Sequence, residues 1–225
     1  MRYLLLLSIT LLYTSAGAQV LSPEFQEFWL NVDQLKSLEQ PKNAAYTGSP
    51  YLFESENTSS VFLNDTVKID GLTIRYNVHN DKMEIKKDGV YYEIPKEKII
   101  PQVMLDTHHF ILMPYLMSHK KRTAYFESLV QGSRLDLYLK HKVILKEPEE
   151  PKPYQEAKLA AFKSSPPKIF IDQGDGVLVY VKDKKDFLKQ VPNKTDELES
   201  FIKKNKTKFR KPDNVKKLVE YYNTL

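Results

Sequence analysis

The chain has 225 residues, a formal net charge of +5 and no cysteine. The lack of cysteine excludes a disulfide framework, and it excludes the lipid anchor that bacterial lipoproteins carry on an N-terminal cysteine. The fold therefore depends on a buried hydrophobic core, which a chain of about 200 residues is long enough to form.

Residues 1–18 have the pattern of a secretory signal peptide. Arg2 supplies a positive start, Leu4–Leu12 is mainly apolar, and Ala16-Gly17-Ala18 has the small side chains of a cleavage site. The apolar run is too short to span a membrane comfortably. We therefore expect cleavage before Gln19, and export of a mature chain without a transmembrane segment to the periplasm or the outside of the cell.

Residues 19–58 are predicted to form a helix and then a loop. Ser22 and Pro23 are typical of a helix start, because a hydroxyl can cap the first turn and proline is tolerated there. Pro41 ends the helix, and the segment after it is polar. Apolar side chains at the spacings of three and four that mark a one-sided helix are Phe25, Phe28, Trp29, Val32 and Leu35.

Residues 59–146 are predicted to form an antiparallel β-meander. Apolar and polar residues alternate, and turn sequences such as Asp70-Gly71 and Asp88-Gly89 interrupt the alternation. Such a sheet has one buried face and one wet face. In the stretch 72–95 the expected core positions are Leu72, Ile74, Tyr76, Val78, Met83, Ile85, Val90, Tyr92 and Ile94.

Residues 147–225 are predicted to add a β-hairpin and about three helices, packed on the sheet as one unit. A stiff proline-rich connector, residues 147–153, leads into the hairpin. The fold class is thus α+β, with a helix at the N-terminus and a helical cluster at the C-terminus. The expected strands are 168–171 and 177–181, and the expected helices are 184–190, 196–205 and 213–223.

One short segment contains three potential metal ligands, His79, Asp81 and Glu84, within six positions. The first two fall in a predicted turn, where Asn and Asp serve the backbone conformation. Glu84 is expected on the wet face, where Lys82 and Lys86 can pair with it. We interpret these residues as a turn and a surface carboxylate, and we predict neither a metal site nor a cofactor.

Arg75 and Tyr91 share the wet face of the same strands and are the predicted contact residues for a partner. No Gly-x-Ser-x-Gly or phosphate-binding glycine loop occurs in the chain. The catalytic residues of any enzyme activity therefore stay unknown, and the patterns favour a protein that is not an enzyme.

Positive charge is concentrated at the C-terminal end. Residues 182–225 contain 13 Lys and Arg against 7 Asp and Glu, a net charge of 13 − 7 = +6. Such a segment can meet anionic partners. Because acidic residues are mixed with the basic ones, we interpret it as the solvated faces of helices, and we predict no nucleic-acid partner.

Three short motifs, Thr47–Leu52, Leu72–Asn77 and Lys217–Asn223, resemble those of a group of exported proteins of Bacteroidota. The group shares a G-x-P-Y-L … L-R-Y-N front and a Y-Y-N tail. The resemblance implies an envelope or secreted location and no activity. It also implies an O-glycosylation acceptor at Thr66, because Asp65-Thr66-Val67 has the Asp-Ser/Thr-apolar form that such bacteria use.

The function that these observations favour is that of a non-catalytic exported cell-envelope protein. Such a protein would bind or bridge a macromolecule, either an envelope protein or a glycan. One alternative is an envelope glycan or peptide hydrolase whose site is scattered through the fold. A second is a periplasmic carrier of an apolar ligand, in which the curved sheet encloses a cavity. The oligomeric state stays open.

Overall fold

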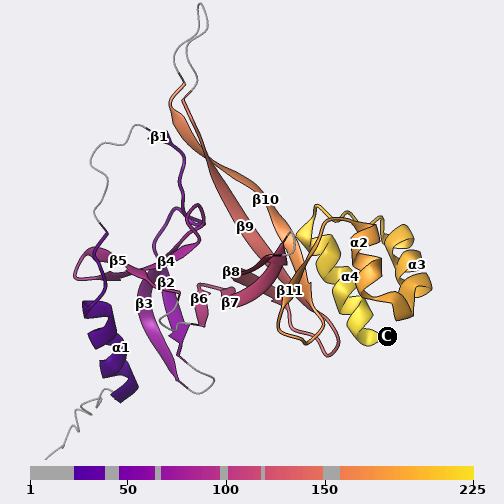
Figure 1. Cartoon of the computed structure of the whole chain (residues 1–225), viewed down its shortest axis with the longest axis horizontal. Coiled ribbons are helices and arrows are strands. Elements are labelled where there is room, and N and C mark those ends of the chain that lie inside the picture. Colours follow the sequence, from indigo (N-terminus) through magenta and orange to yellow (C-terminus); the bar gives the residue numbers. More distant parts are fainter. Residues whose placement is uncertain (1–22, 39–45, 64–66, 97–100, 118–119, 149–157) are drawn as a thin grey trace, which may run out of the picture.

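The computed structural model describes residues 23–38, 46–63, 67–96, 101–117, 120–148 and 158–225. The expected signal peptide and Thr66 lie outside these residues. Within them the fold is α+β, as predicted, with an eleven-stranded sheet that is mainly antiparallel and four α-helices. Figure 1 shows N-terminal strands and one helix at one end of the molecule, and three helices at the other end.

The N-terminal part is a twisted sheet with one helix packed against it. Phe28 and Val32 of this helix are buried against Ile74, Met83 and Ile85 of the strands. These contacts follow from the predicted periods of the helix and the strands. The elements are α1 (Pro23–Asp33), β1 (Tyr46–Thr47), β2 (Asn57–Phe62), β3 (Lys68–Asn77), β4 (Lys82–Lys87), β5 (Val90–Ile94) and β6 (Gln102–Leu105).

The central part is a closed ring of five strands. Strand β11 (Leu178–Val181) pairs antiparallel with β10 (Ala160–Asp172) and parallel with β7 (His108–Met117). The pairing of β11 with β7 closes the ring. Aromatic side chains fill the interior, where the rings of Phe126 and Phe170 lie 4.9 Å apart and are fully buried. The strands are β7 (His108–Met117), β8 (Lys120–Val130), β9 (Asp136–Lys146), β10 (Ala160–Asp172) and β11 (Leu178–Val181).

The order of the strands departs from the simple meander that the alternation predicts. Along the sheet the order is β1-β10-β9-β8-β7-β6-β2-β3-β4-β5. Strand β6 pairs with β2 rather than with β5, and β1 pairs parallel with β10. A strict meander is therefore not confirmed. Because β2 pairs with both β3 and β6, and because β11 closes the ring against β7, the sheet has fewer exposed strand edges than an open meander would have.

The C-terminal part is a cap of three helices on the outer surface of the ring. Phe187, Leu198 and Leu218 are buried against Leu137 and other residues of β9, β10 and β11. All three predicted helices are confirmed, to within one or two residues at their ends. None of the helices in the described ranges is long and apolar enough to cross a membrane. The helices are α2 (Lys184–Gln190), α3 (Thr195–Asn205) and α4 (Pro212–Thr224).

Candidate functional site

The predicted contact residues lie in a network on the outer face of β3, β4 and β5. The guanidinium of Arg75 is sandwiched between the rings of Tyr51 and Tyr91, 4.1 and 3.5 Å from their centroids. Its Nε donates to Oε2 of Glu84 at 2.6 Å. The Tyr51 hydroxyl and the Asn77 amide donate to the same carboxylate. The charges of this network are thus satisfied inside the protein.

Tyr91 was correctly predicted on the same face as Arg75, but the prediction that it is exposed was wrong. Only 5% of Tyr91 is accessible to solvent, and its hydroxyl donates to Oε1 of Glu56 at 2.7 Å. The interpretation of Glu84 as a surface carboxylate was wrong as well, because 3% of it is exposed and it pairs with Arg75. A binding role for Arg75 and Tyr91 stays a prediction, and their burial gives it no support.

The two tyrosines act as neutral hydrogen-bond donors. Burial raises the pKa of Tyr51 to about 12, and the nearby carboxylate of Glu84 adds to this effect. Burial and the hydrogen bond to Glu56 raise the pKa of Tyr91 to about 12. Both phenols therefore stay protonated at neutral pH, where they stabilise the carboxylates that they contact.

The front motifs of the Bacteroidota resemblance meet in this region. The Val78 amide donates to the Pro50 carbonyl at 2.9 Å, and the Leu52 amide donates to the Tyr76 carbonyl at 3.0 Å. The loop that carries Tyr51 is thereby held along the end of β3. These two motifs thus have a structural explanation that requires no ligand.

The tail motif holds the helical cap on the ring. Oδ1 of Asn223 accepts from the backbone amides of Arg134 and Leu135, both at 3.0 Å, and its Nδ2 donates to the Leu135 carbonyl at 2.9 Å. Gly132 makes room for this side chain, because a Cβ at residue 132 would lie 2.0 Å from Nδ2. The motif therefore joins α4 to the turn between β8 and β9.

A second charged cluster surrounds Asp81, in the predicted turn between β3 and β4. Asp81 has a positive φ of 56°. Its Oδ1 accepts from the Tyr76 hydroxyl at 2.6 Å and lies 3.5 Å from Nζ of Lys140 on β9, while Lys96 pairs with Oδ2. Burial lowers the pKa of Lys140, although the charge of Asp81 opposes the shift. The cluster joins the N-terminal strands to the ring.

A third cluster places one carboxylate between two imidazoles on the outer face of the ring. Oε1 of Glu127 lies 2.6 Å from Nδ1 of His108, and Oε2 lies 2.6 Å from Nε2 of His141. Burial by itself raises the pKa of Glu127, but the hydrogen bonds of His141 and His108 outweigh it and hold this pKa below its ordinary value. An imidazole oriented by a carboxylate is one half of a nucleophilic catalytic set. The hydrolase alternative would use His108, whose side chain is 39% exposed.

The carboxylates and imidazoles of these clusters do not come together as a metal site in the described residues. Within the described ranges, no group of three or more His, Cys, Asp or Glu side chains is arranged to hold a metal ion. His79, Asp81 and Glu84 in particular separate, because Asp81 contacts the ring and Glu84 contacts Arg75.

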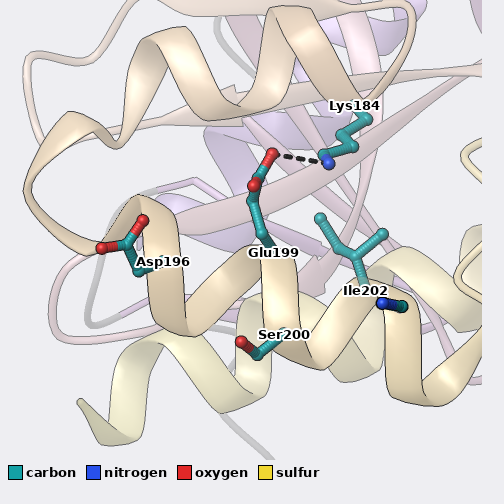
Figure 2. A pocket seen from close by; sticks show the side chains of 6 residues that line it. Lys184, Asp196, Glu199, Ser200 and Ile202 are labelled. Carbon is teal, nitrogen blue, oxygen red and sulfur yellow. Dashed lines mark ion pairs between the residues drawn. The ribbon is translucent and has the colours of Figure 1, made fainter.

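Grooves are found on the helical cap. Figure 2 shows the groove between α2 and α3, which is crossed by the ion pair of Lys184 and Glu199. Their charged atoms lie 2.6 Å apart, and both side chains are nearly half exposed. This groove has a volume of about 440 Å³ and is lined by Lys184, Asp196, Glu199, Ser200, Ile202 and Lys203.

The densest positive charge lies where α3 leads into α4, in residues 203–211, which we term the basic turn. Hydrogen bonds fix its backbone, because the Thr207 amide donates to the Ile202 carbonyl at 3.1 Å and the Lys211 amide donates to the Lys208 carbonyl at 2.9 Å. The turn contains no carboxylate. Its six cations are Lys203, Lys204, Lys206, Lys208, Arg210 and Lys211.

A basic groove of about 600 Å³ lies between this turn and the junction of β11 with α2. Its one acidic side chain, Asp183, caps α2 by accepting from the Asp186 amide at 3.1 Å. The ring of Phe209 is partly buried, 5.7 Å from that of Phe187. The groove is lined by Lys182, Asp183, Lys208, Phe209, Arg210 and Lys211.

The cations of the basic turn differ from the buried charges of the sheet, such as Glu84, which is paired with Arg75. In the part of the chain that the structure describes, none of the six forms an ion pair, whereas Lys184 and Lys194 on the same cap each pair with a glutamate. The prediction of a basic C-terminal segment did not locate this turn. A signal was present in the sequence, since residues 203–212 contain six Lys and Arg without one Asp or Glu.

Comparison of the chain with models of known protein families, with curated proteins and with solved structures found no match. The assignment of function therefore depends on the geometry of these clusters and grooves.

Proposed function

We propose that this chain is a non-catalytic exported cell-envelope protein that binds a macromolecule through its C-terminal helical cap. The observation that carries the proposal is the unpaired positive charge of the basic turn. Placing like charges together on one rigid turn costs free energy through repulsion, and an anionic partner offsets this cost.

The charged clusters of the sheet support the same proposal, because their charges are already satisfied within the protein. Arg75, Asp81 and Glu127 each have their charge or hydrogen-bonding groups occupied by neighbouring side chains. Polar groups that are satisfied in this way stabilise the fold and offer few free groups to a ligand. The interior of the ring is filled with aromatic side chains, so the carrier alternative gains no support from it.

Site-specific photo-cross-linking tests this proposal. A benzophenone amino acid is placed at Lys217, an exposed position of α4, or at Leu30, which is 63% exposed on α1. The full chain is expressed in a bacterium that exports it, and adducts in the envelope fraction are identified by mass spectrometry. We expect a discrete macromolecular adduct from Lys217 and none from Leu30.

The matched position makes the result decisive. Both positions lie on exposed helix surface, so a non-specific collision would label both of them. Equal labelling from the two positions, or labelling from Leu30 alone, would show that the helical cap is not the binding surface.

A further inference from the structure

The residues that line the basic groove are those of a binding site for an acidic sugar, and not only those of a positively charged surface. Four cations, from Lys182, Lys208, Arg210 and Lys211, line it together with the aromatic ring of Phe209. Lys and Arg bind carboxylate or phosphate groups, and an aromatic ring stacks on the apolar face of a sugar. A cationic rim with an aromatic wall thus matches a glycan that bears negative charge.

The shape of the site favours a polymer chain over a membrane surface. A volume of about 600 Å³ is within the range of ligand pockets, whereas a bilayer presents a broad and nearly flat face. Proteins that bind at bilayer interfaces also insert apolar or aromatic side chains. The large apolar residues that the structure shows exposed are Leu30, Tyr46, Val90, Leu116, Leu145 and Leu159, and all of them lie outside the cap.

The groove is also preorganised, which lowers the entropic cost of binding. The backbone of the basic turn is fixed by its own hydrogen bonds, and Phe209 is held against Phe187. Helix α4 begins at Pro212, beside the groove, and has thirteen residues. The positive end of its dipole adds to the local potential, and Asp213 in its first turn offsets part of it.

We infer that the basic groove binds an acidic glycan, with its cations on the carboxylate or phosphate groups and Phe209 against a sugar face. This inference rests on the proposed function and names the partner class. It also gives a role to Phe209, whose ring lines the groove among the cations and would not contribute to binding by charge alone.

Calorimetric titration of the full chain with an oligogalacturonate, a chain of uronic acids, tests the inference, with a neutral galactose oligomer of equal length as the comparison. The variant Lys208→Ala/Arg210→Ala/Lys211→Ala removes three cations of the groove. The control variant Lys120→Ala/Lys121→Ala/Arg122→Ala removes the same residue types from an exposed stretch of β8. We expect binding to weaken about tenfold or more in the groove variant and less than about twofold in the control.

A separate variant, Phe209→Leu, tests the aromatic wall while it keeps an apolar side chain against Phe187. We expect it to weaken oligogalacturonate binding severalfold and to leave binding of inorganic polyphosphate, a charged probe without sugar rings, unchanged. Circular dichroism verifies that each variant is folded before titration. An equal loss for both probes would show that the ring serves only the fold, and would overturn its role in sugar binding.

Further outcomes overturn the whole inference. Equal weakening in the groove and control variants would show that the oligogalacturonate responds only to total charge. Binding to vesicles of phosphatidylglycerol without binding to the oligogalacturonate would identify a lipid surface as the partner. In either case cross-linking from Lys217 can still succeed, so a failure of the glycan inference is distinguishable from a failure of the proposed function.

Discussion

The buried charges of the sheet are paired, whereas, among the residues that the structure describes, the cations of the basic turn on the helical cap are not. Glu84 and, in the turn between β3 and β4, Asp81 are paired with cations, and Glu127 is hydrogen-bonded to two imidazoles. On the cap, the six cations of the basic turn have no carboxylate partner in the described part of the chain. The difference indicates that the buried charges of the sheet stabilise the structure, and that the cations of the basic turn are available to a partner.

The largest effect is expected at Glu84, the most enclosed carboxylate of the sheet. Glu84→Gln leaves the partly buried guanidinium of Arg75 without its counter-charge, and we expect a loss of about 3 kcal/mol in the free energy of unfolding. Urea denaturation measures this loss. Glu93→Gln, which breaks a more exposed pair with Lys82, should cost less than about 1 kcal/mol. Equal losses would contradict an enclosed role for Glu84.

The next effect is expected at the turn that joins the N-terminal strands to the ring. Asp81→Asn keeps a residue that tolerates positive φ but removes the negative charge that faces Lys140 and Lys96, and we expect a loss of about 2 kcal/mol. Asp88→Asn is the matched control, since Asp88 also has a positive φ, of 48°, in an exposed turn. A similar loss at both positions would assign the effect to the backbone rather than to the ion pairs.

Asn223 tests whether the cap is fixed to the ring by its tail motif. Asn223→Ala removes the three hydrogen bonds to the turn between β8 and β9, and we expect a loss of about 1–2 kcal/mol in thermal or urea unfolding. Asn193→Ala, at an exposed position of the short 3-10 helix Pro192–Lys194 on the cap, should change stability by no more than about 0.5 kcal/mol. Amide hydrogen exchange should show faster exchange in α4 of the Asn223 variant alone.

Glu127 provides a test by pH. Its pKa is lowered in the folded state, so its contribution to stability is present above the ordinary carboxyl value near 4.5 and is lost as the pH falls through the folded value. We expect Glu127→Gln to be less stable than the wild type by about 1 kcal/mol at pH 7. The two proteins should converge as the pH falls below about 4. A difference that stays constant over this range would mean that the carboxylate charge contributes nothing.

The smallest effect on stability is expected at the basic turn. Lys208→Ala/Arg210→Ala/Lys211→Ala removes like charges that have no partner, so the free energy of unfolding should change by no more than about 0.5 kcal/mol, or rise slightly. Thermal denaturation at low and high salt measures this. A clear destabilisation would show that these cations stabilise the cap and would remove the contrast with the sheet.

The periods of the sequence predict the elements well, because they report which side of each element is apolar. The prediction of Val90 as a core position was wrong, since it is 40% exposed at the start of β5. The helices at residues 184–190, 195–205 and 212–224 and the hairpins around Tyr76 follow from this signal alone. The pairing of β2 with β6 and the parallel contact of β11 with β7 do not follow from it. They depend on how segments far apart in the chain pack together, which a local period does not encode.

Arg75 and Tyr91 show, at a single site, that a local period cannot predict contacts with distant parts of the chain. Alternation placed them correctly on the outer face of the hairpin. It contains no information about Tyr51, Glu56 and the segment near Leu38 that lie over or beside this face. A face that is polar in sequence can therefore be buried when another part of the chain supplies the matching charges.

The sequence by itself determined the fold class, the helices, most of the turns and the excess of positive charge at the C-terminal end, since each of these depends on neighbouring residues. The tertiary structure alone decided which charges are paired. It enclosed Glu84 and Asp81 by bringing distant partners to them, and it left the cations of the basic turn without an ion pair among the described residues. Desolvation and charge pairing depend on distances in space, so this distinction arises only when the chain is folded.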